Sequence, residues 1–388
     1  MYVGDERGAV LWNFCSVLSI RRNRRSSVIH RTGKFVPRGR FWHDGGTVRL
    51  FHLAQGNIMI KALYLLNSDA YERIYGPDER ADLAALLDTS APLQTAASVQ
   101  QDPSVLADVE VLLSGWGCPV LDANLLAKMP LLKGVFYGAG SIRGVVTPAF
   151  WERTIPITSS YAANAVPVAE YTLAQIILCL KRAWQQVFAI RSRHDYVRSM
   201  TVPGAYGSTV GIISLGMIGR LVARRLQELD VCVVAYDPFV EPDSAADLGV
   251  ELCSLEDVFR RADVVSLHTP WLPQTEGMIG GAHFAMMKEG ASFINTARGA
   301  VVREHEMLNV LKIRRDLFAV LDVVWPEPPA DDSPIFDMEN VILTPHIAGS
   351  LGDECRRMGR IVVEEVNRFL HGEPLHWAIS RERAEIMA

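Results

Sequence analysis

The feature that most constrains the fold is a regular alternation of short apolar segments and helical segments, which begins at Met59 and continues through most of the 388-residue chain. The apolar segments are three to seven residues long, as expected for strands that are buried on both faces. Strands that alternate with helices form mostly parallel sheets with helices on both faces. We therefore expect an α/β fold with strands at 60–66, 109–113, 134–137, 209–213, 231–236, 264–267, 292–295, 318–321 and 341–343.

A longer helical pattern, which opens at Ala165, separates the first three of these strands from the others. Apolar residues recur at helical spacing between Val166 and Leu180, and Pro167 lies near the first turn of the predicted helix, where proline is tolerated. A final helix with one apolar face is predicted over 352–370. Because 388 residues can bury two separate cores, we expect two domains.

The first 57 residues differ from the rest of the chain in charge. They contain ten Arg and Lys residues against three Asp and Glu residues, although the whole chain has a net charge of −5. The basic cluster from Arg21 to Arg25 is compatible with a targeting arm, a nucleic-acid contact or a start codon assigned too far upstream. The weak periodicity favours a poorly ordered extension over 1–58. The negative charge of the whole chain predicts no nucleic-acid or membrane partner.

Six cysteines are scattered along the chain without a C-x-x-C pair. This pattern is typical of free thiols in a reducing compartment, so we expect a cytoplasmic protein with no metal site. The most apolar stretch, Tyr171–Leu180, ends at Lys181 and is shorter than the roughly 20 residues that span a membrane.

A glycine-containing turn joins the predicted strand at 209–213 to the next helix. Gly216 and Gly219 would let the backbone approach a pyrophosphate and let the helix pack closely on the sheet. The first helical residues, Met217 and Ile218, would direct free amide groups at the phosphates. Ser214 stands where the G-x-G-x-x-G motif has its first glycine, so the turn taken alone is also compatible with an ordinary strand–helix connection.

An acidic residue follows this turn at the spacing of a dinucleotide site. Asp237 ends the next predicted strand, 18 residues after Gly219, where a carboxylate accepts hydrogen bonds from both ribose hydroxyls. The same carboxylate repels a 2′-phosphate, and Pro238 rather than an arginine follows it. The sequence therefore favours NAD over NADP as the cofactor.

Three residues near strand ends have the chemistry that reduces a 2-keto acid. Arg298 offers a planar fork that matches a carboxylate, and His346 can exchange a proton near neutral pH. Glu327, 19 residues before His346, could orient the imidazole and favour its charged form. Taken singly, a histidine after a strand is more often structural, and an arginine at a strand end usually lies at the surface or caps a helix.

Together these motifs resemble the D-isomer-specific 2-hydroxyacid dehydrogenase family, which includes phosphoglycerate dehydrogenases and glyoxylate/hydroxypyruvate reductases. The resemblance extends from about Met59 to Pro374. It implies two Rossmann-like, doubly wound parallel-sheet domains, with the cofactor domain inserted in the substrate domain. The substrate domain would comprise 59–160 with 347–379, and the NAD-binding domain 161–346. A homodimer is also implied.

The resemblance assigns roles to particular residues. Arg298 would bind the substrate, His346 would be the acid/base and Glu327 its partner. Ala139 and Gly140 match a glycine loop whose backbone amides grip the substrate carboxylate, and bare amides on such a loop form an anion site in any fold. The cofactor residues implied are Gly216, Met217, Ile218, Gly219, Asp237, Thr269, Pro270, Thr275, Ala297 and Asp322, of which Asp322 would hold the nicotinamide carboxamide.

The chain departs from the family just after the glycine loop. The family often has an acidic residue two places after the last glycine, where this chain has Ile142 followed by Arg143. This departure puts the detailed substrate geometry in doubt. Arg143 is either an extra anion contact or a surface arginine. Trp116 and Trp325 each lie either at the border of the pocket or in the core.

We expect an oxidoreductase that transfers a hydride between NAD(H) and a small 2-hydroxy acid or its 2-keto partner. The alternative is an NAD(H)-sensing, non-catalytic protein on the same fold, which would retain similar residues. A formate dehydrogenase is disfavoured because that branch typically carries glutamine where Glu327 stands. The residues do not define which 2-hydroxy acid is used, and glyoxylate and hydroxypyruvate are expected from the family alone.

Overall fold

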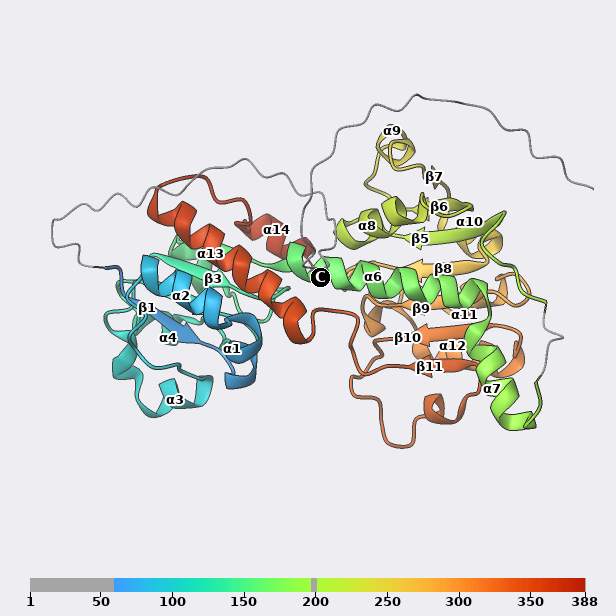
Figure 1. Cartoon of the computed structure of the whole chain (residues 1–388), viewed down its shortest axis with the longest axis horizontal. Helices are drawn as coiled ribbons and strands as arrows, with labels where there is room; N and C mark the ends of the chain where they lie inside the picture. Colours follow the sequence, from blue (N-terminus) through green and yellow to red (C-terminus); the bar gives the residue numbers. More distant parts are fainter. Residues whose placement is uncertain (1–58, 197–200, 388) are drawn as a thin grey trace, which may run out of the picture. The chain divides into compact units, whose positions relative to one another are not determined.

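The computed structural model describes residues 59–196 and 201–387. The predicted N-terminal extension, 1–58, lies outside these residues. Within them the chain forms two parallel β-sheets, one of four strands and one of seven, with helices between successive strands (Figure 1). The predicted α/β fold with two doubly wound sheets is confirmed.

The smaller sheet contains β1 (Ala62–Leu65), β2 (Val111–Ser114), β3 (Gly134–Tyr137) and β4 (Ile157–Ser159), paired in chain order. The segment 88–94 forms parallel bridges to β1 at Lys61 and Leu65, so the chain order reverses beside β1 as in other doubly wound sheets. At the other edge, Ala378 forms an antiparallel bridge to Thr158 of β4. β4 was not predicted.

The larger sheet has the strand order β11-β10-β9-β8-β5-β6-β7, and every pairing is parallel. After β5 the chain fills one side of the sheet with β6 and β7, and then returns to place β8 on the other side. Ligands of such sheets bind outside the carboxyl ends of the strands at this switch point. The strands are β5 (Ser208–Ile213), β6 (Val231–Tyr236), β7 (Glu251–Leu252), β8 (Val264–Leu267), β9 (Ser292–Asn295), β10 (Phe318–Leu321) and β11 (Val341–Leu343).

The long helix α6 (Tyr161–Leu180) begins four residues earlier than predicted, so Pro167 lies inside the helix and not in its first turn. The prediction was wrong because the helix-favouring run that precedes the proline was not counted. By length and composition α6 is one helix, among the described residues, that could cross a membrane. Its buried residues pack against α8 (Met217–Leu226), α13 (Arg356–Leu370), β8 and β9, which is typical of a core helix (Figure 1).

Most of the remaining helices connect the strands, and α13 and α14 follow the last strand. The predicted last helix is divided, because 352–355 form a 3₁₀ turn before α13 begins. The helices are α1 (Ser68–Ile74), α2 (Pro77–Leu86), α3 (Ala96–Gln101), α4 (Ala123–Ala127), α5 (Pro148–Glu152), α7 (Ala183–Arg193), α8 (Met217–Leu226), α9 (Pro242–Ala246), α10 (Leu255–Arg261), α11 (Gly281–Ala285), α12 (Glu304–Ile313), α13 (Arg356–Leu370) and α14 (Arg381–Ile386).

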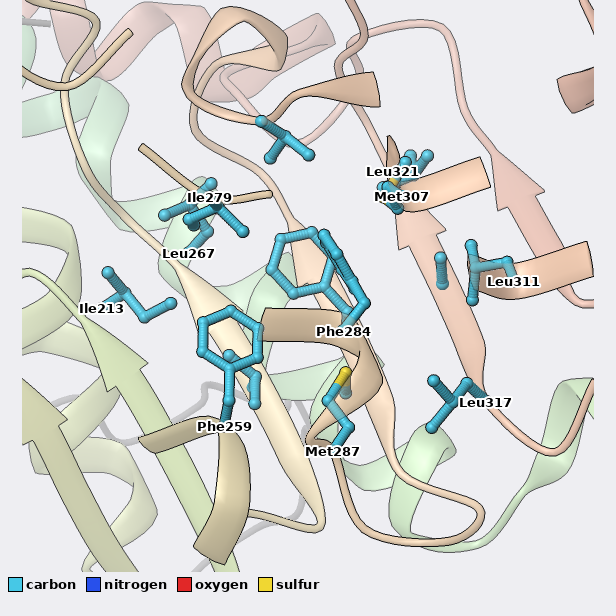
Figure 2. Packing of buried hydrophobic residues seen from close by; sticks show 14 of the residues in the cluster. Ile213, Phe259, Leu267, Ile279, Phe284, Met287, Met307, Leu311, Leu317 and Leu321 are labelled. Atoms are coloured by element: carbon cyan, nitrogen blue, oxygen red, sulfur yellow. The ribbon is translucent and has the colours of Figure 1, made fainter. Parts of the chain in front are cut away.

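Each sheet has a hydrophobic cluster on both faces. On one face of the larger sheet, Phe284 and Phe293 meet edge to face with ring centroids 5.0 Å apart, and Phe259 packs on both (Figure 2). Burial of such a side chain contributes about 2–3 kcal/mol. In the smaller sheet the core includes Ala384 of α14, beyond the predicted boundary at 379. The domain boundaries themselves stay a prediction.

Candidate active site

A histidine and a glutamate form a hydrogen-bonded pair in the loops that follow β10 and β11. His346 Nδ1 lies 2.7 Å from Glu327 Oε1. The two side chains are 47% and 40% exposed, so the pair adds little to stability, and its main effect is to orient the imidazole. His346 has a left-handed backbone with φ of +55°, and its amide donates to the Asp322 carbonyl at 3.0 Å. The position of His346 is therefore fixed both by the contact of its ring with Glu327 and by the hydrogen bond of its backbone amide.

Asp322 shapes the turn that carries His346. This residue follows β10 and is only 1% exposed. Its carboxylate accepts hydrogen bonds from the amides of Ile347 and Ala348, both at 2.9 Å, and from the Thr344 hydroxyl at 2.6 Å. Three donors from 344–348 thus converge on one carboxylate. Its predicted contact with the nicotinamide carboxamide stays a prediction.

Arg298 lies directly after β9 and is partly buried. Its Nη1 donates to the Ala297 carbonyl at 2.6 Å. Burial lowers the pKa of Arg298, the nearby Glu327 carboxylate opposes that shift, and the Arg143 guanidinium adds to it. Since a guanidinium ordinarily titrates above pH 12, Arg298 stays a cation at neutral pH. The site therefore contains a fixed positive charge near the Glu327–His346 pair.

The loop of Arg298 is fixed by two residues that sequence reasoning missed in this role. The Asn295 side chain accepts from the Ala297 amide at 3.0 Å and donates to the Arg298 carbonyl at 3.1 Å. Gly299 lies so close to the next loop that an added Cβ would be 2.0 Å from the Val324 carbonyl carbon. This close approach brings the loops of Arg298 and Glu327 together, and only glycine permits it.

At the start of α8, the glycine turn 214–219 has an open side and a crowded side. A Cβ on Gly219 would lie 2.1 Å from the Ser214 carbonyl oxygen, whereas a Cβ on Gly216 would have no atom within 4 Å. Ser214 has a left-handed backbone with φ of +75°, and its hydroxyl lies 2.8 Å from that of Thr269. The first amides of α8, at Met217 and Ile218, have no carbonyl partner within the helix. The space over Gly216 therefore fits a pyrophosphate.

The carboxylate of Asp237 lies beside this turn. It accepts from the Leu215 amide at 2.7 Å and from the Phe239 amide at 2.9 Å. These bonds fix the carboxylate at the end of β6, next to the switch point between β5 and β8. Open space, free amides and a fixed carboxylate together match the chemistry of a dinucleotide.

The segment 268–275 follows β8 at the same edge of the sheet. The Thr275 hydroxyl donates to the Pro270 carbonyl at 2.5 Å and accepts from the Leu272 amide at 2.9 Å, which closes a tight turn. His268 is buried with its Nε2 3.0 Å from the Ser266 hydroxyl, and burial lowers its pKa to about 3. His268 is therefore neutral at physiological pH and is no candidate for the proton donor.

The glycine loop after β3 has the geometry of an anion site. The carbonyl of Ala139 accepts from the Ser159 hydroxyl at 3.1 Å, and that of Gly140 accepts from the same hydroxyl. The amides of Ala139, Gly140 and Ser141 donate to no acceptor among residues 59–196 and 201–387. Ser159, at the end of β4, thus fixes the loop while leaving its amides free. Sequence reasoning missed Ser159 because it missed β4.

Arg143 and two tryptophans lie near the site, and a third tryptophan does not. Arg143 Nη1 donates to the Trp271 carbonyl, and the Trp271 and Trp325 rings are 4.5 Å apart at 60°. Trp325, two residues before Glu327, is 51% exposed. Trp116 instead packs against both hydrophobic clusters of the smaller sheet. Arg143, Trp271 and Trp325 therefore border the site, whereas Trp116 belongs to the core.

A separate surface pocket of about 480 Å³ lies beside α12. Its lining includes Glu304, Leu308 and Trp325. No predicted site residue lines it, so the candidate active site rests on its chemistry and not on the volume of this cavity.

The comparisons with known proteins agree with this geometry. Residues 174–348 match the domain described as "D-isomer specific 2-hydroxyacid dehydrogenase, NAD binding domain". The D-3-phosphoglycerate dehydrogenase of Mycobacterium bovis is 37% identical over 254 residues, which are 65% of this chain and 48% of that protein. The (S)-sulfolactate dehydrogenase of Chromohalobacter salexigens is 35% identical over 251 residues, 64% of this chain and 81% of that protein.

Among solved structures, the D-mandelate dehydrogenase of Rhodotorula graminis is similar with a TM-score of 0.71 and 25% identity, over 83% of this chain and 98% of that one. The chain spans about half the length of the phosphoglycerate dehydrogenases that it matches.

Proposed function

Because this chain belongs to the D-isomer-specific 2-hydroxyacid dehydrogenase family, we propose that it transfers a hydride between NAD(H) and a small 2-hydroxy acid or its 2-keto partner. The observation that carries the proposal is the 2.7 Å contact between His346 and Glu327 beside the cationic Arg298. A proton donor and a carboxylate-binding cation are the two protein groups that this reaction needs.

The nicotinamide ring supplies the hydride when the cofactor is bound. The amides of Met217 and Ile218 would hold the pyrophosphate over Gly216, and Asp237 would accept from the ribose hydroxyls. Thr269, Pro270, Thr275 and Ala297 would line the cleft along the strand ends. The negative charge of Asp237 supports NAD over NADP.

The substrate carboxylate would lie on Arg298 and on the free amides of Ala139 and Gly140. A guanidinium next to the carbonyl also polarises that bond. His346 then gives its proton to the carbonyl oxygen during reduction and takes one from the hydroxyl in the reverse direction. Glu327 keeps the imidazole oriented through the contact with its Nδ1.

Replacement of His346 tests this function. With NADH and a panel of 2-keto acids, we expect His346→Ala to lower kcat by about 10²–10⁴-fold, the usual contribution of a general acid. NADH binding, followed by protein-to-nicotinamide fluorescence transfer, should survive. His371→Ala, which removes an exposed histidine on another element, is the matched control. Turnover near the wild-type value in His346→Ala refutes the assignment.

The same panel separates the enzyme from the alternative. Wild-type protein that binds NADH but turns over none of the 2-keto acids would be an NAD(H)-sensing, non-catalytic protein. Parallel assays with NADPH test the cofactor preference.

We also propose that the protein is a cytoplasmic homodimer. Helix α7 has no buried residue within the described chain and exposes Val187 and Ile190, so a second copy of the chain could cover it. Free cysteines at 118, 179, 232, 253 and 355 fit a reducing compartment. Sedimentation equilibrium should give twice the 43.0 kDa chain mass, and a monomer would contradict the proposal.

A further inference from the structure

Two arginines in the candidate active site lack a carboxylate partner. Among residues 59–196 and 201–387, neither Arg143 nor Arg298 has an ion pair within 4.0 Å. Some other arginines have such a partner, for example Arg261 with Glu251 at 2.7 Å, whereas Arg153 donates to backbone carbonyls instead. Like charges left near each other without a counterion are unfavourable, so the site favours an anionic ligand.

Arg143 is exposed, and a hydrogen bond joins its guanidinium to the loop that follows β8. Its Nη1 donates to the Trp271 carbonyl. The Trp271 indole in turn donates to Glu276 at 3.0 Å and packs on Trp325, which lies two residues before Glu327. Arg143 therefore points toward the loop that carries half of the Glu327–His346 pair.

The donors of Arg143 are only partly used. A guanidinium has five N–H groups, and one described contact, to the Trp271 carbonyl, uses one of them. Arg143 also follows Gly140 by only three residues, and its own amide lies 3.4 Å from the Ser141 hydroxyl. It therefore borders the free amides proposed to hold the substrate carboxylate.

The proposed position of the substrate carboxylate does not use the free donors of Arg143. In the proposed function the substrate carboxylate lies on Arg298 and the amides of Ala139 and Gly140. The charge of Arg143 is then still without a partner. Repulsion from Arg143 is one of the effects that lower the pKa of Arg298. An anion bound to Arg143 would offset this repulsion and so favour the charged form of Arg298.

We propose that Arg143 binds a second anionic group of the substrate, so that the preferred substrates are 2-keto or 2-hydroxy acids with a carboxylate, sulfonate or phosphate on the third carbon. This inference rests on the proposed function and deepens it by naming the substrate class. Arg143 acts here as a specificity residue: it contacts the far end of the substrate and takes no part in the proton transfer.

The test compares substrates that differ by one anionic group on the third carbon. For the full-length protein with NADH, kcat/KM is measured for hydroxypyruvate against 3-phosphohydroxypyruvate, and for pyruvate against oxaloacetate and 3-sulfopyruvate. We expect the wild-type protein to prefer the doubly anionic member of each pair by at least about tenfold, because a charge-assisted contact is worth 1.4 kcal/mol or more. The three comparisons also show whether a phosphate, a carboxylate or a sulfonate is bound best.

Variants of Arg143 test whether this residue causes the preference for doubly anionic substrates. Arg143→Ala should lower kcat/KM for the doubly anionic substrates by about 10–100-fold, mainly through KM, and change that for pyruvate and hydroxypyruvate by less than threefold. Arg143→Lys should recover part of the loss. Arg315→Ala is the charge-matched control, because Arg315 is exposed and precedes β10, whereas the site follows the strands.

The outcomes separate this inference from the function on which it rests. No turnover of any 2-keto acid refutes the proposed function, and the substrate class with it. Turnover without a preference for the doubly anionic substrates refutes only the role of Arg143. An equal loss for both members of each pair in Arg143→Ala also refutes it, since a specificity residue must discriminate.

Discussion

The nucleotide turn, residues 214–219, and the Glu327–His346 pair are built in opposite ways. The turn depends on backbone geometry, with a crowded Gly219, an open Gly216 and Ser214 in a left-handed conformation. The pair consists of two half-exposed side chains on loops. Since the pair has little burial of its own, its precision comes from buried groups beneath it, above all Asp322. Cofactor binding and proton transfer should therefore fail independently.

The largest effect is expected at Asp322. Asp322→Ala leaves the amides of Ile347 and Ala348 and the Thr344 hydroxyl without their acceptor, which should lower the free energy of unfolding by about 3 kcal/mol or more. Activity should fall further, because the turn of His346 loses its support. Urea unfolding and kcat measure the two effects. Asp331→Ala, at an exposed loop position, should change stability by less than about 0.5 kcal/mol.

Removal of the charge on Glu327 should affect activity but not stability. Glu327→Gln keeps a hydrogen-bonding group beside His346 and should lower kcat by about 10²-fold, or ~2.7 kcal/mol in the barrier. The free energy of unfolding should change by less than about 1 kcal/mol, because the pair is half exposed. Glu339→Gln, at an exposed position, is the control. Equal kcat values for Glu327→Gln and the wild type would show that the pair is only structural.

The two glycines of the turn should separate folding from binding. Gly219→Ala places a Cβ against the Ser214 carbonyl and should destabilise the protein by about 1–3 kcal/mol. Gly216→Ala places its Cβ in open space, so Tm should stay unchanged while the Kd for NADH rises at least about tenfold. Thermal unfolding and NADH titration measure both. Unchanged NADH binding in Gly216→Ala would place the pyrophosphate elsewhere.

A smaller effect should appear in the pH dependence of stability. His268 has its pKa lowered to about 3 by burial, whereas an unfolded histidine titrates near 6.5. Because the unfolded chain then binds the extra proton, His268 lowers the free energy of unfolding as pH falls from about 6.5 toward 3, by about 1 kcal/mol at pH 5.5. His268→Asn should therefore lose less stability than the wild type between pH 7.5 and 5.5, and equal losses in the two proteins would contradict this effect of burial. The measurement is urea unfolding at both values.

Most of the fold could be predicted because strands buried on both faces are continuous apolar runs. The exceptions have physical causes. β4 is three residues long and includes Thr158 and Ser159, and β7 has only two residues, so neither produces an apolar run. The start of α6 was misplaced because Pro167 lies in the interior of the helix.

In the site, sequence reasoning named the residues with distinctive chemistry, and the structure places Glu327 on His346 and both near Arg298. It missed Asn295 and Ser159 as supports, because they act by hydrogen-bonding to loop backbones and no spacing marks such a role. Arg143 was left between two interpretations, and its contact with Trp271 places it at the site.

The most direct test of hydride transfer follows an isotope. The wild-type protein is given NADH deuterated at both C4 positions with a 2-keto acid that it reduces, and the hydroxy acid is analysed by mass spectrometry and NMR. One deuteron is expected on the second carbon of the product, and none there when unlabelled NADH reacts in deuterated water. A product without label from the cofactor, or the absence of a reduced product with every 2-keto acid, would contradict it.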